Sequence, residues 1–237
     1  MARHKPAAEG GYQRGEETRA RIIDAAVVVF GERGYDGAST RDIATAAGVN
    51  APAIQYYFDG KEGVYLACVE HLITLLWRKM APTVEAAEQA LLDEICPDTR
   101  LIEVSLGILG TVVSTIQDSP EATVWRAFLD RHQAGLCPES ATMAFEERFK
   151  ARIGRVIRQL IARLAGFAVE DERTVIHSMA LFTQGLAFRV QKPKLLAALN
   201  WTQIDRKEME LVCEVVLTQA RFTLEGLVRL RDQPPAD

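Results

Sequence analysis

A short segment near the N-terminus, AGVNAPAIQYYF, gathers residue types that suit contact with a DNA duplex. Gln55 carries an amide that can pair with the edge of adenine, and the apolar edges of Pro52 and Ala53 can touch a thymine methyl group. The hydroxyls of Tyr56 and Tyr57 can donate to phosphates while their rings pack. We interpret this segment as a surface that reads the major groove.

The elements around the segment follow a known pattern. The preceding stretch, STRDIATAAG, offers Ser39 or Thr40 as a helix N-cap and Gly48 as the turn residue. Asn50 should cap the next helix by accepting a hydrogen bond from the amide of Ala53. A helix, a tight turn and a second short helix form the helix-turn-helix pattern, whose second helix enters the major groove. From spacing alone, a small helical hairpin with core aromatics is the alternative.

A helix of about two turns cannot hold itself together in water, so its neighbours must fix it in place. The apolar residues of the region have the spacing to do so. We expect Ile43, Ala47, Val49, Ile54 and Phe58 to pack against Ile22 and Phe30.

Enzyme chemistry finds no support in the sequence. The motifs G-x-S-x-G, H-E-x-x-H, G-x-x-x-x-G-K-[ST] and G-x-G-x-x-G do not occur. The cysteines are widely spread and form no C-x-x-C pair, which argues against a zinc site or a disulfide framework and fits a reducing cytosol. We therefore expect no catalytic residue, no cofactor and no metal. The cysteines are Cys68, Cys96, Cys137 and Cys213.

The periodicity of the remaining chain is helical, without an alternating strand pattern. The expected fold class is all-α, with an N-terminal three-helix helix-turn-helix domain and a larger helical domain for effector binding and dimerisation. No run of eighteen apolar residues predicts a membrane span, and no apolar run near the N-terminus predicts a secretory signal. The expected parts are a flexible arm (1–15), the helix-turn-helix domain (16–62), the larger domain (63–231) and a disordered tail (232–237).

Prolines and glycines punctuate the expected helices. A long helix should begin near Lys61 and end before Pro82, because proline disrupts a helix interior. Further helices are expected over 99–118, 119–134, 140–166, 171–191 and 205–230.

Three stretches between Thr18 and Val69 carry a specific pattern: RIIDAAVVVFGERGYDGAST, RDIATAAGVN and YYFDGKEGVY. They resemble the DNA-binding domain of TetR-family transcriptional regulators. The resemblance implies a base or phosphate contact for Arg41 and a phosphate contact for Lys61. The DNA-contacting positions that it implies are Thr40, Arg41, Asn50, Ala51, Pro52, Ala53, Gln55, Tyr56, Tyr57 and Lys61.

The stretch from Asp171 to Asp205 is similar to the CecR-like branch of this family, as is VNAPAIQYYFDGKEGVY. Together these stretches extend the resemblance over most of the chain.

The charge of the DNA-binding region departs from expectation. Residues 1–60 contain seven Lys and Arg against eight Asp and Glu, whereas a DNA-binding domain should have a basic footprint. Binding must then depend on locally placed cations and helix N-termini. The arm, with Arg3, Lys5 and Arg14, either enters the minor groove as homeodomain arms do or stays a solvated tail.

One reading helix contacts too few bases for genomic specificity, so we expect a homodimer on a near-palindromic operator. The last two long helices, over 174–190 and 206–230, should form the dimer surface, as in the family. The alternative is that they complete a monomeric core. The expected interface residues are Met209, Val212, Val216, Ala220, Leu224 and Leu227.

The middle helices are expected to hold a pocket for an unknown small-molecule effector. For each lining residue, ordinary core packing is the competing interpretation. The candidate lining residues are Trp77, Leu109, Val113, Trp125, Arg126, Phe128, His132, Phe149, His177 and Gln184.

The expected function is a cytoplasmic, ligand-responsive transcriptional regulator, in the family's usual mode a repressor, without a membrane partner. Effector binding should shift the helix that begins at Lys61 and so weaken the complex with operator DNA. The alternative is a helical dimeric scaffold or interaction protein with a weak DNA-binding domain.

Overall fold

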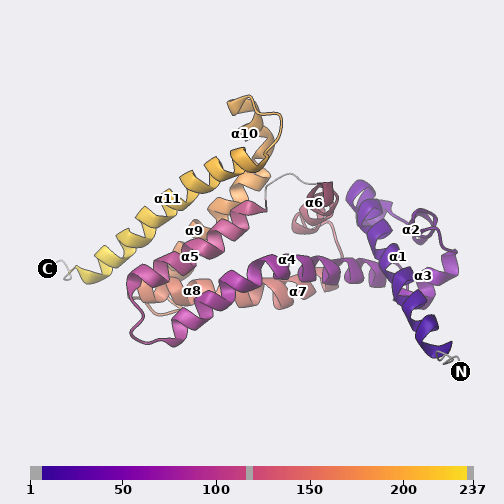
Figure 1. The fold of residues 1–237 in the computed structure, drawn as a ribbon, viewed down its shortest axis with the longest axis horizontal. Helices are drawn as coiled ribbons and strands as arrows, with labels where there is room; N and C mark the ends of the chain where they lie inside the picture. The colour runs from indigo at the N-terminus through magenta and orange to yellow at the C-terminus, as the bar shows by residue number, and fades with distance from the viewer. Residues whose placement is uncertain (1–6, 116–119, 234–237) are drawn as a thin grey trace, which may run out of the picture. The chain divides into compact units, whose positions relative to one another are not determined.

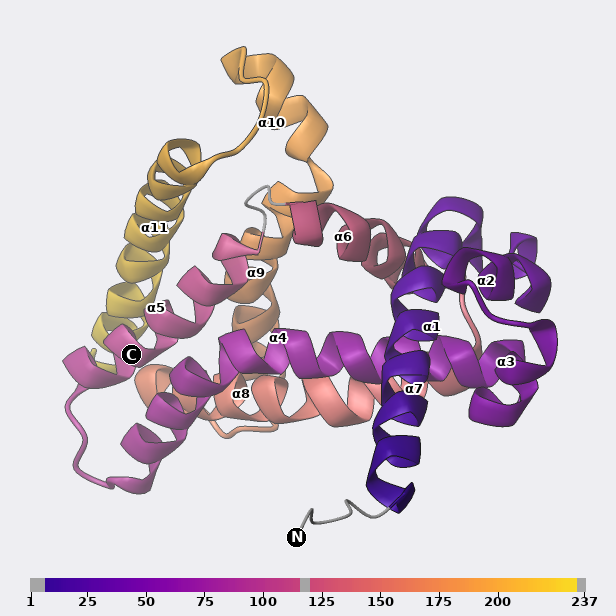
Figure 2. The same cartoon turned by 45° about the vertical axis from the view of Figure 1, so that its right-hand side comes forward.

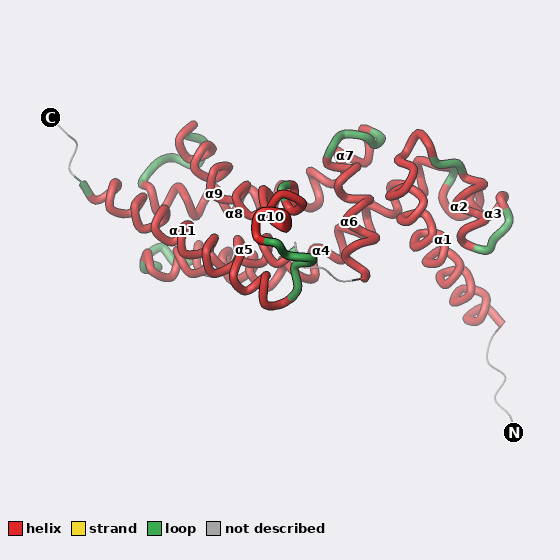
Figure 3. Tube along the Cα trace, turned by 90° about the horizontal axis from the view of Figure 1, so that it is seen from above, coloured by secondary structure: helices red, strands yellow, loops and turns green. Residues whose placement is uncertain are grey.

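The computed structural model describes residues 7–115 and 120–233, and every regular element in these ranges is a helix (Figure 3). The all-α prediction is confirmed. The described residues form two compact units: a head unit, up to Leu75 and over 120–148, and a body unit, over 76–115 and 149–233. In chain order the helices are α1 (Ala7–Gly37), α2 (Thr40–Ala47), α3 (Ala51–Phe58), α4 (Lys61–Leu92), α5 (Asp98–Ser114), α6 (Pro120–Gln133), α7 (Glu139–Phe145), the π-helix η1 (Glu146–Lys150), α8 (Ala151–Ala165), α9 (Glu172–Val190), α10 (Lys192–Leu199) and α11 (Arg206–Asp232).

The core of the head unit forms where α1, α2 and α3 meet the first turns of α4 (Figure 1). Phe30 of α1 lies edge-on to Tyr65 of α4, with ring centroids 4.9 Å apart, and both side chains are buried. Such aromatic pairs stabilise a core beyond their buried area. The packing predicted from the sequence is confirmed for Ile22, Phe30, Ile43, Ala47, Ile54 and Phe58, which are all buried, while Val49 is half-buried.

Helix α6 belongs to the head unit, although the sequence placed it in the larger domain. It approaches α1 closely at Gly31, where an added Cβ would lie 3.3 Å from the Cβ of Ala127. Arg131 donates from Nε to the carbonyl of Gly31 at 2.8 Å and from Nη2 to that of Glu32 at 2.9 Å. A cation near the C-terminal end of a helix is stabilising, so Arg131 holds α6 against α1.

The core of the body unit is formed by α5, α8, α9 and α11 together with the second half of α4 (Figure 2). Helix α11 buries Val216, Ala220 and Leu224 on one face, at a helical spacing of four residues. Gly110 of α5 allows the close approach of Leu217, whose Cδ1 would lie 3.5 Å from an added Cβ.

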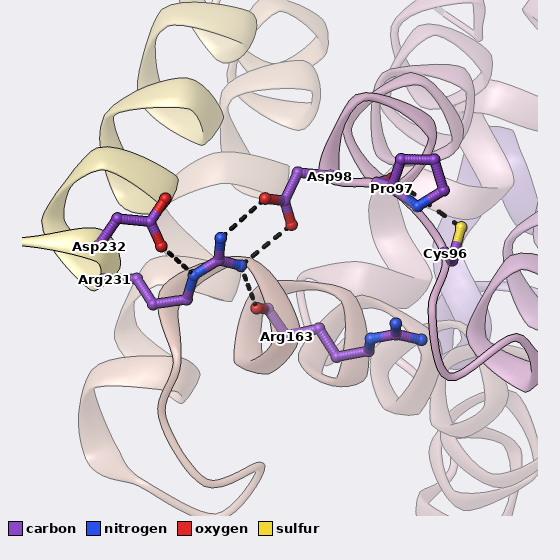
Figure 4. Close-up of polar contacts among 6 residues, drawn as sticks. All are labelled: Cys96, Pro97, Asp98, Arg163, Arg231 and Asp232. Atoms are coloured by element: carbon purple, nitrogen blue, oxygen red, sulfur yellow. Dashed lines mark hydrogen bonds and ion pairs between the residues drawn. The ribbon is translucent and has the colours of Figure 1, made fainter.

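Figure 4 shows the polar cluster that ties the end of α11 to the start of α5. Arg231 donates from Nη2 to Oδ2 of Asp98 at 2.7 Å and from Nη1 to Oδ1 at 3.0 Å. Its Nη1 also donates to the carbonyl of Arg163 at 3.1 Å. These hydrogen bonds from Arg231 hold the pKa of the Asp98 carboxyl below its ordinary value. A bidentate pair of this kind fixes geometry as well as charge, and here it fixes how three helices meet.

The prediction that α4 ends before Pro82 is wrong, because the helix continues to Leu92. A proline inside a helix removes one hydrogen bond and crowds the preceding turn. Pro82 is exposed, so the carbonyl that loses its partner can meet water. Met80, Val84 and Ala87 are buried in the body core around it, and their packing outweighs the cost of the proline.

Other boundaries also differ from expectation. The single helix expected over 140–166 is divided by the π-helix η1, and α10 follows α9 with Pro193 in its first turn, where no amide is needed. Helix α1 begins at Ala7, inside the expected arm over 1–15, and α11 reaches Asp232. Residues 1–6, 116–119 and 234–237 lie outside the described part of the chain.

Gly63 lies where the start of α4 approaches the end of α3, and its substitution tests how close this approach is. A Cβ at this position would lie 1.6 Å from the carbonyl oxygen of Phe58, which is backbone and cannot turn away. We expect Gly63→Ala to lower the free energy of unfolding by about 1–3 kcal/mol or more, as overpacking does. Gly226→Ala is the matched control, since an added Cβ meets nothing within 4 Å there, and it should be neutral or stabilising by about 0.5–1 kcal/mol. Urea denaturation measures both, and equal stability of the two variants would contradict the close approach.

Candidate DNA-binding surface

Helix α2 is fixed at both ends by local hydrogen bonds. The Ser39 hydroxyl accepts from the amide of Asp42 at 3.2 Å, and the Asp42 carboxylate accepts from the amide of Ser39 at 3.0 Å. This reciprocal capping box satisfies two amides that have no partner inside the helix. Gly48 ends the helix at φ 63°, a conformation that favours glycine. Of the two N-caps considered from the sequence, the structure uses Ser39.

Helix α3 begins as predicted. Asn50 is the N-cap, and its Oδ1 accepts from the amide of Ala53 at 3.1 Å. Pro52 occupies the first turn, where its missing amide costs nothing. Ile54 and Phe58 are buried and attach the helix to α1, α2 and α4. The opposite face of α3 is therefore left for solvent or a partner.

The exposed face of α3 carries the residues that sequence reasoning assigned to base contact. Ala51, Pro52 and Gln55 are exposed, and Tyr56 is 82% exposed. The Tyr56 ring lies edge-on to that of Tyr57, with centroids 5.0 Å apart. The structure thus brings together on the head unit all ten predicted positions, on α2, α3 and the start of α4. Of the others, Arg41 and Asn50 are exposed, and Thr40, Ala53, Tyr57 and Lys61 are half-buried.

Lys61 is half-buried, and its ammonium makes contacts within the head unit. Its Nζ donates to the carbonyl of Tyr35 at 3.0 Å and to that of Ala38 at 3.2 Å. The ammonium also lies 4.3 Å from the centroid of the Tyr35 ring. These contacts hold the start of α4 against the turn between α1 and α2. In this structure, therefore, Lys61 braces the helix-turn-helix fold.

The cationic side chains of the head unit are partly used within it. Arg33 Nη1 lies 2.8 Å from Oδ1 of Asp42, and Arg19 lies over the Phe58 ring with its Cζ 5.2 Å from the centroid. Hydrogen bonds from Ser39, more than the charge of Arg33, lower the pKa of Asp42. Arg41 is exposed on α2 beside this pair. Arg33 and Arg19 thus both make contacts within the head unit.

The predicted effector-pocket residues belong to two different units. The head unit contains Trp125, Arg126, Phe128 and His132 of α6, and Phe128 and His132 are buried in its aromatic core. The body unit contains the remaining six, so the ten residues do not line one cluster within either unit. The six are Trp77, Leu109, Val113, Phe149, His177 and Gln184.

The six residues predicted for the dimer interface are all buried within the chain, at 6% exposure or less, and so cannot face a second copy. They form the inner face of α11 and pack into the body core, because this helix has two apolar faces and the more continuous one covers α5 and α8. The sequence pattern of α11 contained the second face too, but periodicity cannot tell which face turns inward. The buried residues are Met209, Val212, Val216, Ala220, Leu224 and Leu227.

The outer faces of α9 and α11 each carry several exposed apolar residues. Phe222 is 64% exposed, Ile176 63% and Met179 62%, which is unusual for side chains of this size. Their spacing on each helix places them on one side. The set on α9 is Val175, Ile176, Met179, Leu186 and Val190, and the set on α11 is Leu211, Val215, Phe222 and Leu230.

In residues 7–115 and 120–233, no three His, Cys, Asp or Glu side chains gather as a group that could hold a metal ion. In the same ranges, no helix is long and apolar enough to cross a membrane.

Comparison with known proteins places these features in a family. Residues 22–68 match the family described as "Bacterial regulatory proteins, tetR family". Residues 101–227 match the family described as "HTH-type transcriptional dual regulator CecR, C-terminal domain". The chain is 32% identical over 215 residues to the HTH-type transcriptional dual regulator CecR of Shigella flexneri, covering 90% of this chain and 94% of that protein.

Two further proteins are similar to this chain, one in part of its sequence and one in its fold. The HTH-type transcriptional repressor NicS of Pseudomonas putida is 38% identical over 60 residues, which cover 25% of this chain and 28% of NicS. The crystal structure of AibR in complex with isovaleryl coenzyme A and operator DNA superposes with a TM-score of 0.59 at 13% identity, covering 85% of this chain and 97% of AibR. At that identity the likeness concerns the fold alone.

The capped α2–turn–α3 unit with an outward-facing α3, joined to a larger helical unit, defines a helix-turn-helix transcriptional regulator and not an enzyme. The chain belongs to the TetR family, and its C-terminal region is of the CecR type.

Replacing Lys61 separates its bracing role from a phosphate contact. We expect Lys61→Met to lower the free energy of unfolding by about 1–3 kcal/mol, because the carbonyls of Tyr35 and Ala38 lose a charged donor. Lys79→Met, at an exposed position of α4, is the control and should change it by less than about 0.5 kcal/mol. Urea denaturation gives both values. Wild-type stability of Lys61→Met, combined with weaker binding to every DNA sequence, would instead support the phosphate contact.

Proposed function

We propose that this TetR-family regulator binds a near-palindromic operator as a homodimer, represses transcription from it in the cytoplasm, and is released by a small-molecule effector. The observation that carries the proposal is α3 itself: an eight-residue helix anchored by Ile54 and Phe58, with Gln55 and Tyr56 facing outward. Its outward residues are of the types that read base edges and phosphates.

DNA contact in this proposal depends on placement more than on total charge. The N-terminus of α3 is small and open at Ala51 and Pro52, so its backbone can approach base edges closely. Arg41 on α2 and the hydroxyls of Tyr56 and Tyr57 are available for the phosphates on either side. A region without an excess of basic residues predicts a modest dependence of affinity on salt, since few counterions are released. The names of two similar proteins support this proposal: NicS is named a repressor, and AibR was crystallised with operator DNA.

A second copy of the chain is the proposed occupant of the outer faces of α9 and α11. Two reading helices would then contact half-sites about 34–36 Å apart or a multiple of this distance. The faces offer large apolar side chains on two adjacent helices of the body unit, and exposed apolar area of this kind marks an interaction surface. The proposed interface therefore uses α9 and α11, the two helices predicted from the sequence, but the exposed face of α11 in place of the buried one.

The proposed effector site lies in the body unit. There Trp77 and Phe149 form an edge-on pair with centroids 6.1 Å apart, and Leu109 and Val113 are buried next to Gly185 of α9. Within the described residues, Gln184 Oε1 is buried and has no hydrogen-bond partner, so it offers an acceptor to a ligand. AibR was crystallised with isovaleryl coenzyme A, which shows that this fold accepts a ligand.

Signal transfer in this proposal passes along α4. The helix contributes residues up to Leu75 to the head unit and residues from Leu76 to the body unit. A ligand that binds the DNA-incompetent state more tightly would shift the population of that state and weaken operator binding. The competing function, a dimeric scaffold with a weak DNA-binding domain, draws on the net negative charge of residues 1–60 and on the engaged Lys61.

Selection of bound duplexes from a random pool tests the proposal. The wild-type protein should enrich one near-palindromic sequence, and Gln55→Ala should keep its melting temperature while it loses preference at one base position in each half-site, because the exposed amide contributes to reading and not to the core. Failure of the wild-type protein to enrich any sequence at low salt would exclude operator binding and favour the scaffold.

Phe222→Asp tests the proposed dimer surface. The new carboxylate would be buried without a partner in the dimer but solvated in the monomer, so the variant should sediment as a monomer at concentrations where the wild-type protein is a dimer. Leu92→Asp is the matched control, because Leu92 is 74% exposed and lies on α4, outside the α9 and α11 faces. A Phe222→Asp protein that sediments as the wild-type dimer would place the interface elsewhere.

A further inference from the structure

The side-chain amide of Gln55 contacts Asp59, the residue that ends α3. Its Nε2 donates to Oδ1 of Asp59 at 2.6 Å. The backbone of Asp59 is fixed separately, because its amide donates to the backbone carbonyl of Gln55 at 3.2 Å. Because a carboxylate oxygen only accepts hydrogen bonds, it must face the nitrogen of the amide and not its oxygen. The chemistry of Asp59 therefore decides which way the Gln55 amide is turned.

Asp59 occupies a backbone conformation that glycine adopts more readily than aspartate. It ends α3 at φ 58° and ψ 33°, in the left-handed region, and Gly60 follows at φ 107°. In the described ranges only Asp59 and Asn200 have positive φ without being glycine. Glycine would fit this position with less strain. A side chain is nevertheless present here, and the contact that it makes is with the exposed amide of Gln55.

The orientation of the Gln55 side-chain amide determines which of its hydrogen-bonding groups remain for a base. With one Nε2 hydrogen directed to Asp59, the second Nε2 hydrogen and Oε1 remain. Gly60 leaves room beside Oε1, since even an added Cβ would stay 3.7 Å from it. One donor and one acceptor on the same amide match N7 and the N6 amino group of adenine. The reversed amide, with its oxygen toward Asp59, would place two acceptors together.

We propose that Asp59 is a positioning residue for base reading, which holds the Gln55 amide in the orientation that pairs with adenine. The inference rests on the proposed operator binding and adds to it the base that Gln55 selects and the residue that imposes this choice.

The negative charge of Asp59 affects the affinity for every DNA sequence, whereas its contact with Gln55 affects the preference for one base. A carboxylate at the end of α3 opposes the approach of phosphates and so lowers binding to all sequences alike. Its benefit arises only where Gln55 meets the correct base, because a side chain that is already ordered loses less freedom on binding. Removing Asp59 should therefore strengthen binding to unrelated DNA while it weakens discrimination at one base pair.

Two substitutions remove the charge of Asp59 and weaken its hold on the Gln55 amide by different amounts. Asp59→Asn keeps an oxygen acceptor but adds an NH2 donor, so it can meet the Gln55 amide in either orientation, and asparagine tolerates the left-handed conformation. Asp59→Gly removes the charge and every hydrogen-bonding group of the side chain, and it suits that conformation best. Both variants lose the same charge, so a difference between their base preferences does not come from charge. Melting temperatures confirm that both are folded.

The experiment is selection of bound duplexes from a random pool with the wild-type protein, Asp59→Asn, Asp59→Gly and Gln55→Ala. We expect the wild-type protein to prefer adenine at one position of each half-site, and Gln55→Ala to lose this preference altogether. Asp59→Asn should lose part of the preference, and Asp59→Gly about tenfold, with the rest of the site unchanged. Adenine preference kept at the wild-type level in Asp59→Gly would overturn the positioning role while operator binding stands. A wild-type protein that enriches no sequence would overturn operator binding, and the role of Asp59 with it.

Discussion

Burial of Ile54 and Phe58 is the constraint on which the DNA-binding surface depends. Eight residues form too few hydrogen bonds to keep a helix folded, so α3 exists because these two side chains are removed from water by its neighbours. The remaining features of the head unit secure that burial. Gly63 lets α4 start directly against the carbonyl of Phe58, and Lys61 ties α4 to the turn between α1 and α2. A surface that reads DNA is thus the outer side of a core that cannot shift without losing α3.

The same division between an inner and an outer face recurs in the body unit. Helix α11 buries Val216, Ala220 and Leu224 and exposes Phe222 on the other side. The inner face completes the fold of one chain, and the outer face is left with exposed apolar area. In the head unit the outer face is polar, Arg33 is paired with Asp42, and Lys61 is bound to backbone carbonyls. In the proposed mode of binding, recognition therefore depends on the geometry of few groups, among them Gln55 and the aspartate that contacts it.

Local chemistry explains why so much of the head unit could be predicted. The Ser39–Asp42 capping box, the Gly48 turn and the Asn50 cap involve residues within a few positions of each other, so their spacing alone specifies them. Pro82 shows the opposite case. Its local preference is to end a helix, and packing of distant residues in the body core overrules that preference. The π-helix η1 has no local signal of its own in the sequence.

The sequence by itself determined the helical class, the helix-turn-helix and the outward residues of α3, because these follow from spacing within one or two turns. Tertiary structure alone decided which face of α11 is buried, which unit α6 joins, and that Lys61 turns inward. Each of these depends on which surfaces meet across the fold, and a helical period carries two faces without saying which one will be covered. Hydrogen bonds between distant residues, such as those of Arg131 and Arg231, likewise exist only once the helices have met.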